Sequence, residues 1–253
     1  MLITSLDNDK IKEYAKLKER RFRKDKKLFI AEGVHLVLEA YKAGLIKELF
    51  LEEEALLPMD VPTTYASKEV MAKLSSLETT PAAIAICDIL EAKKELGQKI
   101  LLLDDIQDPG NLGTIIRSAT AFNIDTLILS PNTVDLYNDK VLRATQGMAF
   151  HVNVIVKDLK EAIEEIKASE IPVYGTRLEY GEDVRNIKEK DKMRYALVMG
   201  NEGQGVKEEI IRMCDKFLYI DMSEKAESLN VSIAASIILY ELNRWFYGIY
   251  INR

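Results

Sequence analysis

The sequence is poor in the residues that thiol and metal chemistry requires. Its 253 residues include only two cysteines and two histidines. Cys87 and Cys214 stand far apart and outside any CxxC pattern, so we expect neither a disulfide framework nor a zinc site. We expect His35 and His151 to be structural, and no metal to be bound. This cysteine usage favours a reducing compartment, the cytoplasm.

Long apolar runs are also missing. No run reaches the roughly 20 residues that a membrane-spanning helix needs, and the first residues, MLITSLDNDK, lack the basic and then apolar order of a signal peptide. Hydrophobic residues make up 47% and charged residues 30% of the chain, as in ordinary soluble proteins. We therefore expect a cytoplasmic protein with no membrane partner, built as one large domain or two small ones.

Positive charge is concentrated near one end of the chain. The formal net charge is −6, yet residues 10–27, KIKEYAKLKERRFRKDKK, hold ten Lys or Arg and three acidic residues, a net charge of +7. The remainder therefore carries −13. Such a basic arm favours a phosphate-backbone partner, although a solvated helix face laced with ion pairs is the alternative.

The chain divides into two parts. Residues 1–92 mix helix and strand, with helices predicted at 33–44 and 68–77 and short strands after each. A charged stretch without apolar periodicity follows, and we place a linker at 93–98. Residues 99–253 then alternate short apolar strands with helices, which predicts a parallel α/β sheet covered on both faces. The strands are expected at KILLLDDI, TLILSP, HVNVIV, PVYGTRL, YALVMGN and KFLYIDM.

Three predicted strand ends are rich in Gly, Asn and acidic residues. They are QDPGNLG at 107–113, which leads into a helix carrying Arg117, NEGQG at 201–205, and SEKAESLNVS at 223–232. Each alone is explained by a turn or a helix cap. Because ligands bind beyond the carboxyl ends of parallel strands, the three loops together predict one site. GNEGQG is not a GxGxxG fingerprint, so a dehydrogenase is disfavoured.

The third loop opens an unusually apolar helix, which carries no charge until Glu241. We predict that this helix starts near Ser228, because Ser228 and Asn230 are good capping residues. A polar ligand at its start would suit this arrangement. A helix that is apolar on nearly all sides has to be covered by its own core or by a second subunit.

These segments, in this order, resemble the motifs of the SpoU/TrmH family of RNA 2′-O-ribose methyltransferases in the SPOUT superfamily. LDDIQDPGNLGTIIRSATAF resembles the first motif, ALVMGNEGQGV the second and ESLNVSIAASIILYE the third. The match covers residues 99–253. The first 90 residues resemble the family's small substrate-binding domain, through FIAEGVHLVLEA and TTPAAIAI.

The resemblance implies an α/β fold: a C-terminal SPOUT α/β domain with a deep trefoil knot at 99–253, preceded by a small α/β ribosomal-protein-like RNA-binding domain at 1–92. It implies S-adenosylmethionine as the cofactor and a homodimer whose active site lies at or near the subunit interface. The expected substrate is RNA, with ribosomal RNA, 23S in particular, preferred over transfer RNA. Transfer RNA, base methylation by the same fold, and a non-catalytic RNA-binding or ribosome-assembly factor remain alternatives.

Site residues follow from the motif match position by position. The resemblance implies that the catalytic residues are Asn111, Arg117, Glu202, Ser228 and Asn230. It implies that the cofactor contacts are Thr176, Met199, Gly200, Asn201, Gly203, Ile220, Met222 and Leu229. The basic arm adds Lys18, Arg20, Arg21, Arg23 and Lys24 as RNA contacts. Asp221 and Glu224 stand where many members of the family have Pro and Gly, which makes this loop more acidic.

The expected chemistry is in-line transfer of a methyl group from a sulfonium to a ribose 2′-oxygen. Alignment of donor and acceptor contributes up to roughly 7–11 kcal/mol. The family assigns removal of the hydroxyl proton to its Arg, here Arg117, but a guanidinium stays protonated with a pKa above ~12. A physically easier hypothesis is that Arg117 grips the adjacent phosphate, while a phosphate oxygen or Glu202 accepts the proton.

Overall fold

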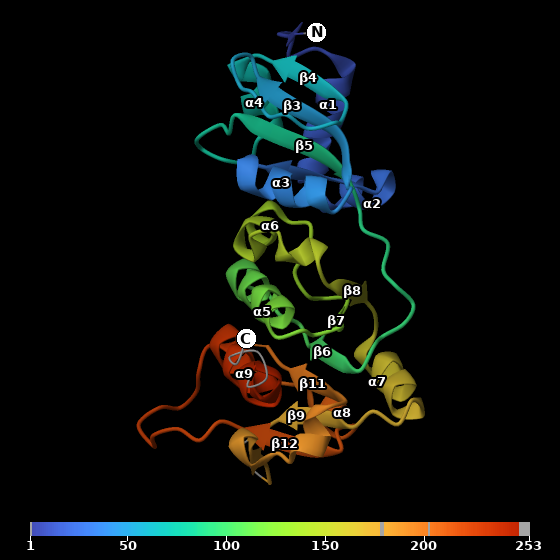
Figure 1. Ribbon diagram of the computed structural model, residues 1–253, viewed down its shortest axis with the longest axis vertical. Helices are drawn as coiled ribbons and strands as arrows, with labels where there is room; N and C mark the ends of the chain where they lie inside the picture. The colour runs from blue at the N-terminus through green and yellow to red at the C-terminus, as the bar shows by residue number, and fades with distance from the viewer. Residues whose placement is uncertain (1, 178–179, 202, 248–253) are drawn as a thin grey trace. The chain divides into compact units, whose positions relative to one another are not determined.

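The computed structural model describes residues 2–177, 180–201 and 203–247. The chain forms two compact units, each with its own sheet and core (Figure 1). The first unit comprises Met1–Glu91 and Asp135–His151, and the second comprises Ala92–Val134 and Val152–Arg253. Within the described residues, no helix is both long enough and apolar enough to cross a membrane.

The first unit is built on a mixed five-stranded sheet with the order β1-β4-β3-β5-β2. Its strands are β1 (Leu2–Ile3), β2 (Leu28–Glu32), β3 (Ile46–Glu52), β4 (Thr63–Ala66) and β5 (Ala83–Asp88). Its helices are α1 (Asp9–Ala15), α2 (Arg20–Lys26), α3 (Val34–Lys42), α4 (Lys68–Leu74) and α6 (Asp139–Thr145), with short 3-10 turns η1 (Lys16–Lys18) and η2 (Met148–Phe150). The predicted helices at 33–44 and 68–77 and the strands that follow them are present.

Strand β2 was not predicted from the sequence, because its short apolar run ends at Glu32 and continues almost directly into the apolar pattern of α3. Leu28 and Ile30 face the core that α1 and α4 cover. Phe29 faces the opposite side, where its ring lies 4.8 Å from that of Tyr137 and 5.6 Å from that of Phe150 (ring centroids). Residues 135–151 therefore cover a face of the first sheet, although they come from the middle of the chain.

Arg23 also ties this segment to the first unit. Its guanidinium donates to Asp135 Oδ2 from Nε at 3.1 Å and from Nη2 at 2.5 Å, and its Nη1 donates to the carbonyls of Leu17 and Lys18, both at 2.8 Å. Arg23 is only 5% exposed. The prediction that Arg23 contacts RNA is therefore wrong for this structure, because its donors are occupied inside the unit.

The other four basic residues predicted as RNA contacts lie on the surface of the first unit. Lys18, Arg20, Arg21 and Lys24 are all exposed, in η1, in α2 or next to it. Helical geometry explains the difference, because the side chain of Arg23 falls on the inward face of the seven-residue helix α2 while its neighbours point outward. An exposed basic surface remains, without its central arginine.

The second unit is built on a seven-stranded sheet with the order β10-β12-β9-β11-β6-β7-β8, in which every neighbouring pair is parallel. Its strands are β6 (Lys99–Leu103), β7 (Thr126–Leu129), β8 (Asn153–Val156), β9 (Val173–Thr176), β10 (Glu182–Asp183), β11 (Tyr195–Met199) and β12 (Lys216–Tyr219). Its helices are α5 (Pro109–Ala121), α7 (Leu159–Ala168), α8 (Glu208–Ile211) and α9 (Val231–Tyr247), with 3-10 turns η3 (Val184–Asn186) and η4 (Glu189–Lys192). The predicted parallel α/β sheet is confirmed; the trefoil knot stays a prediction.

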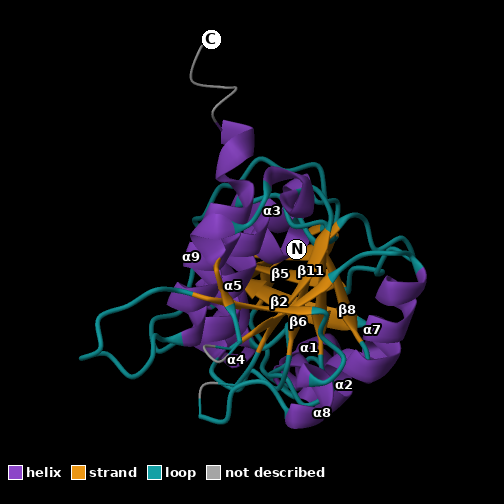
Figure 2. Ribbon diagram, turned by 90° about the horizontal axis from the view of Figure 1, so that it is seen from below, coloured by secondary structure: helices purple, strands orange, loops and turns teal. Residues whose placement is uncertain are grey.

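Helices cover both faces of this sheet. Helix α7 packs through Ile163 and Ile166, and α8 through Ile210, against a core that includes Ile100 and Val198. Figure 2 places α5 and α9 together on the other side of the sheet from α7. Strands β6, β7 and β11 are buried on both faces and read as continuous apolar runs, which made them predictable from the sequence. Strands β8 and β12 are only partly buried but were also predicted, whereas the two-residue strand β10 was not.

A buried polar contact fixes the far end of α9 to the sheet. Asn243, 0% exposed, accepts a hydrogen bond from Lys99 Nζ at 2.5 Å and donates to Tyr195 Oη at 2.9 Å. Burial lowers the pKa of Lys99. Because Lys99 begins β6 and Tyr195 begins β11, the helix is tied to the two central strands that lead to the loops described below.

Replacing Arg23 with methionine should lower the free energy of unfolding by about 3 kcal/mol, because it leaves the carboxylate of Asp135 and two carbonyls without their donor. Urea denaturation followed by circular dichroism measures the change. Arg21→Met, on the exposed side of the same helix, serves as the matched control and should change stability by no more than about 0.5 kcal/mol. Equal effects for the two variants would contradict the structural role of Arg23.

Candidate functional site

A cavity of about 550 Å³ opens at the C-terminal edge of the second sheet. Its walls are the segments that follow β9, β11 and β12 together with the first two turns of α9. All eight positions predicted to contact the cofactor line it: Thr176, Met199, Gly200, Asn201, Gly203, Ile220, Met222 and Leu229. The structure therefore brings together residues that are spread over more than fifty positions of the sequence.

Strand order explains this convergence. Strand β9 pairs with both β11 and β12, so the three strands are direct neighbours. Because all run parallel, their carboxyl ends meet at one edge of the sheet, where ligands bind in folds of this class. The cavity forms there.

The segment Gly200–Gly205 closes on itself as a tight loop. Asn201 and Gly205 exchange backbone hydrogen bonds of 3.0 and 2.9 Å, and Asn201 Oδ1 accepts from the backbone N–H of Gly203 at 2.8 Å. A Cβ at Gly200 would lie 2.1 Å from the carbonyl carbon of Gly205, so only glycine permits this approach of the two backbones. Gly200, Asn201, Gly203 and Gly205 of this loop line the cavity.

The start of α9 joins the third loop to the first. Asn230 Oδ1 accepts hydrogen bonds from Ser232 N at 2.9 Å and Ser232 Oγ at 2.6 Å, so Asn230 caps the helix, which begins at Val231 and not at Ser228 as predicted. Asn230 Nδ2 donates to Asn111 Oδ1 at 2.9 Å. Ser228 and Asn230 both line the cavity. Two predicted catalytic asparagines thus lie in contact.

Helix α5 carries the other residues of the first motif. Asp108 caps it by accepting from Asn111 N at 2.8 Å, and Pro109 occupies its first turn. Further along, Ser118 Oγ lies 2.6 Å from Ser236 Oγ of α9. Small hydroxyl side chains at this contact let the two helices approach closely, which keeps Asn111 beside Asn230.

Arg117, the predicted catalytic arginine, is not brought to the cavity. Arg117 lies exposed on α5 and is not among the residues that line the cavity. Glu202 lies outside the described residues. The structure therefore brings the two asparagines together at the cavity, whereas Arg117 is exposed and does not line it.

The acidic loop between β12 and α9 has a partner on the neighbouring segment. Arg185 Nη2 donates to Asp221 Oδ2 at 2.9 Å, and the same guanidinium contacts Asp183, whose pKa it lowers. Asp221, which stands where many members of the family have another residue, thus forms an ion pair with Arg185. Both Arg185 and Asp221 are more than half exposed, so this ion pair contributes little to the stability of the loop.

Several residues that line the cavity were not predicted. They are Arg177, Gly205, Leu218, Tyr219, Glu227, Val231, Ala234 and Ile238. Most are direct neighbours of predicted positions. Val231, Ala234 and Ile238 follow the i, i+3, i+7 spacing of one helix face, so helical periodicity applied to α9 would have found them.

Comparisons with known proteins bear on this geometry. A curated relative is the 23S rRNA (guanosine(2553)-2'-O)-methyltransferase RlmP of Bacillus subtilis, 38% identical over 95% of this chain and 98% of the relative. An AdoMet-bound rRNA methyltransferase structure from Sinorhizobium meliloti superposes with a TM-score of 0.85 at 27% identity, covering 97% of this chain and 98% of that one. An RNA 2'-O ribose methyltransferase structure gives a TM-score of 0.81 at 28% identity, covering 98% and 100%.

Family profiles cover both parts of the chain. The profile of the MRM3-like substrate binding domain matches residues 8–85. The profile of the SpoU rRNA Methylase family matches residues 98–240, which include the cavity, the asparagine pair, all of α5 and the first ten residues of α9. The resemblance inferred from the three motifs is thereby confirmed. The chain belongs to the SpoU rRNA methylase family.

Proposed function

We propose that this protein is an S-adenosylmethionine-dependent methyltransferase that methylates a ribose 2′-hydroxyl of RNA, in 23S ribosomal RNA. The cavity formed by three sheet-edge loops, with the Asn111–Asn230 contact at the helix start that forms one wall, is the observation that carries this proposal. Family membership and the names of the full-length relatives support it. RNA is the acceptor because it alone presents a 2′-hydroxyl.

The cavity suits S-adenosylmethionine in size and chemistry. Its volume of about 550 Å³ falls within the range of small-molecule sites. Leu218 and Ile238 offer apolar surface and Glu227 a carboxylate for a cationic group. When bound, the cofactor supplies an electrophilic methyl group on a sulfonium sulfur.

The chain's own residues then position the acceptor. Methyl transfer forms a C–O bond to the ribose, breaks the C–S bond of the donor and releases the hydroxyl proton. The Asn111–Asn230 pair, with Ser228 beside it, orients the ribose in line with the donor. Arg117 holds the adjacent phosphate through a charge-assisted contact, which lowers the cost of negative charge on the attacking oxygen. The proton passes to a phosphate oxygen or to Glu202.

A second copy of the chain completes this arrangement. Helix α9 presents an apolar stripe at i, i+4, i+7, in which Ile233 is 51% exposed, Ile237 is half-buried and Tyr240 is 50% exposed. Tyr240 packs against Phe122 at the end of α5, with ring centroids 6.0 Å apart. A dimer formed along α9 and α5 covers this stripe and places the exposed Arg117 at or near the subunit interface.

The two parts of the chain divide the work. Residues 1–92 select the RNA, with the exposed Lys18, Arg20, Arg21 and Lys24 contributing salt-sensitive contacts to its backbone. Residues 99–253 bind the cofactor and carry out the transfer, with the trefoil knot shaping the cavity. Both cysteines are free, in keeping with a reducing cytoplasm, where we place the enzyme.

The purified protein, incubated with 23S rRNA transcript and labelled S-adenosylmethionine, should yield a 2′-O-methylated nucleoside after digestion of the RNA. Mass spectrometry of the nucleosides identifies the product. A methylated base would show base methylation instead of ribose methylation. Methylation of transfer RNA alone would make transfer RNA the substrate. The absence of both cofactor binding and product would favour a non-catalytic RNA-binding factor.

Arg117→Lys should lower kcat about 10²-fold in this assay, because an ammonium keeps the charge but loses the two-pronged contact with phosphate. Arg212→Lys, an exposed substitution on the opposite side of the unit, provides the control and should leave kcat unchanged. Full activity of the Arg117 variant would refute the grip on phosphate.

Gly200→Ala should reduce S-adenosylmethionine affinity at least tenfold, because the new Cβ forces the loop apart where it borders the cavity. Isothermal titration calorimetry measures the affinity. Gly44→Ala, in the first unit, is the control: a Cβ there has no neighbour within 4 Å, and the substitution should leave cofactor affinity unchanged. Equal loss in both variants would show that loop closure is not what matters.

Ile233→Asp combined with Tyr240→Asp should convert a dimer into a monomer, because two carboxylates would be buried in the apolar contact. Light scattering after size exclusion distinguishes twice 28.7 kDa from 28.7 kDa. Leu56→Asp, at a leucine that is 86% exposed in the first unit, is the control. A wild-type protein that runs as a monomer would contradict the dimer.

A further inference from the structure

Asp105 has an unfavourable backbone conformation directly after β6. Its φ is +56°, in the left-handed region that glycine adopts readily. For a residue with a Cβ this conformation costs roughly 1 kcal/mol. Contacts on all sides hold it there. Its backbone N–H donates to Ser130 Oγ at 2.8 Å, and its Oδ1 accepts from the same hydroxyl group at 2.6 Å. This turn connects β6 with the loop that leads to Asn111.

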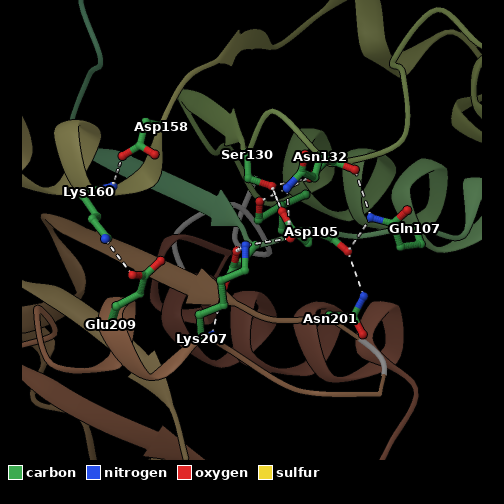
Figure 3. Close-up of polar contacts among 12 residues, drawn as sticks. Asp105, Gln107, Ser130, Asn132, Asp158, Lys160, Asn201, Lys207 and Glu209 are labelled. Carbon is green, nitrogen blue, oxygen red and sulfur yellow. Dashed lines mark hydrogen bonds and ion pairs between the residues drawn. The ribbon is translucent and has the colours of Figure 1, made fainter.

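Lys207 supplies the main charged contact of this turn. Its Nζ lies 2.6 Å from Asp105 Oδ2 and 3.2 Å from Asp104 Oδ1, and its backbone N–H donates to Asp104 Oδ2 at 2.9 Å. Burial acts to raise the pKa of Asp105, but the hydrogen bonds from Lys207 and Ser130 outweigh it and lower that pKa. Figure 3 shows Lys207, Ser130 and Asn132 converging on Asp105.

The same turn is joined to the wall of the cavity. Asn201 Nδ2 donates to the carbonyl oxygen of Asp105 at 2.8 Å, and Gln107 Nε2 donates to it at 3.1 Å. The backbone N–H of Asp104 donates to the carbonyl of Met199 at 2.9 Å. Met199 and Asn201 line the cavity, whereas Asp104, Asp105 and Lys207 do not. One backbone turn therefore contacts both the loop before α5 and the Gly200–Gly205 loop.

We propose that Lys207 is a positioning residue for methyl transfer, which holds the turn at Asp105 so that the Gly200–Gly205 loop and the Asn111 loop keep their mutual geometry. The inference rests on the proposed function, since it concerns the same site. Lys207 does not line the cavity; it acts through Asp105, which contacts Asn201. Loss of the ion pair releases the strained turn, and the loops on both sides of it lose their common anchor.

The substitution that tests this proposal is Lys207→Met, which keeps the length of the side chain and removes its charge. Calorimetry should show at least a tenfold weaker affinity for S-adenosylmethionine, and kinetics with RNA should show a lower kcat as well, because small misplacements of aligned groups are costly. KM for RNA should not change, because the basic arm lies in the first unit. Lys207→Arg, which restores the charge, should recover most of both losses.

Lys160 provides a matched control in the same region. Its Nζ lies 2.6 Å from Glu209 Oε2, the same distance as in the Lys207 pair, and this ion pair contacts neither loop (Figure 3). Lys160→Met should leave cofactor affinity and kcat at the wild-type level. A loss equal to that of Lys207→Met would show a general charge effect and overturn the proposal.

Substitutions at Asp105 distinguish the effect of the ion pair from that of the strained backbone. Asp105→Gly removes the carboxylate but suits the left-handed φ, so its thermal midpoint should stay near the wild-type value while its cofactor affinity falls as in Lys207→Met. Asp105→Ala loses both features and should be less stable as well. If Asp105→Gly binds and turns over like the wild type, the ion pair does not position the loops and the proposal is wrong.

Different results would contradict the proposed function and the positioning role of Lys207. A wild-type protein that neither binds S-adenosylmethionine nor methylates RNA would remove the proposed function and with it this proposal. A wild-type protein that does both, with Lys207→Met indistinguishable from it, would remove the positioning role alone. A Lys207→Met variant with a lower thermal midpoint and unchanged affinity and kcat would make Lys207 a stabilising residue only.

Discussion

The side-chain amide of Asn230 is the contact on which the architecture of the site depends. Its oxygen caps α9 and its nitrogen donates to Asn111, a residue 119 positions earlier in the chain. An amide can serve both because its carbonyl oxygen accepts hydrogen bonds while its NH2 group donates them. The contact fixes where α9 begins, and thus where the wall of the cavity stands relative to the loop before α5.

Around this contact, hydrogen bonds and ion pairs within the protein orient the polar groups of the site. The Gly200–Gly205 loop is closed by its own hydrogen bonds, the turn at Asp105 is held by Ser130 and Lys207, and Asn243 ties the far end of α9 to the sheet. Donors and acceptors that are already oriented need little reorganisation during a reaction. This is the arrangement that alignment-dependent methyl transfer requires, since the protein contributes position more than reactive groups.

Charge is distributed with a similar separation of roles. In the first unit, Arg23 lies inside and holds Asp135, while its basic neighbours in the sequence remain on the surface. In the second unit, Lys207 is engaged with two carboxylates, whereas Arg117 lies exposed on α5. Identical residue types thus form buried or partly buried ion pairs at some positions and lie exposed at others.

Much of the second unit was determined by the sequence alone. Its central strands read as apolar runs, and parallel strands end at one edge, so the cofactor positions were predictable as neighbours. Strand β2 escaped prediction because its short apolar run ends at Glu32 and continues almost directly into the apolar pattern of α3. The burial of Arg23, the position of Arg117 outside the cavity and the ion pair between Lys207 and Asp105 were decided only by tertiary structure. The two ion pairs join residues that strand order and helix packing bring together from about a hundred positions apart. Local sequence patterns reflect neighbouring residues only, so they do not predict contacts over such separations.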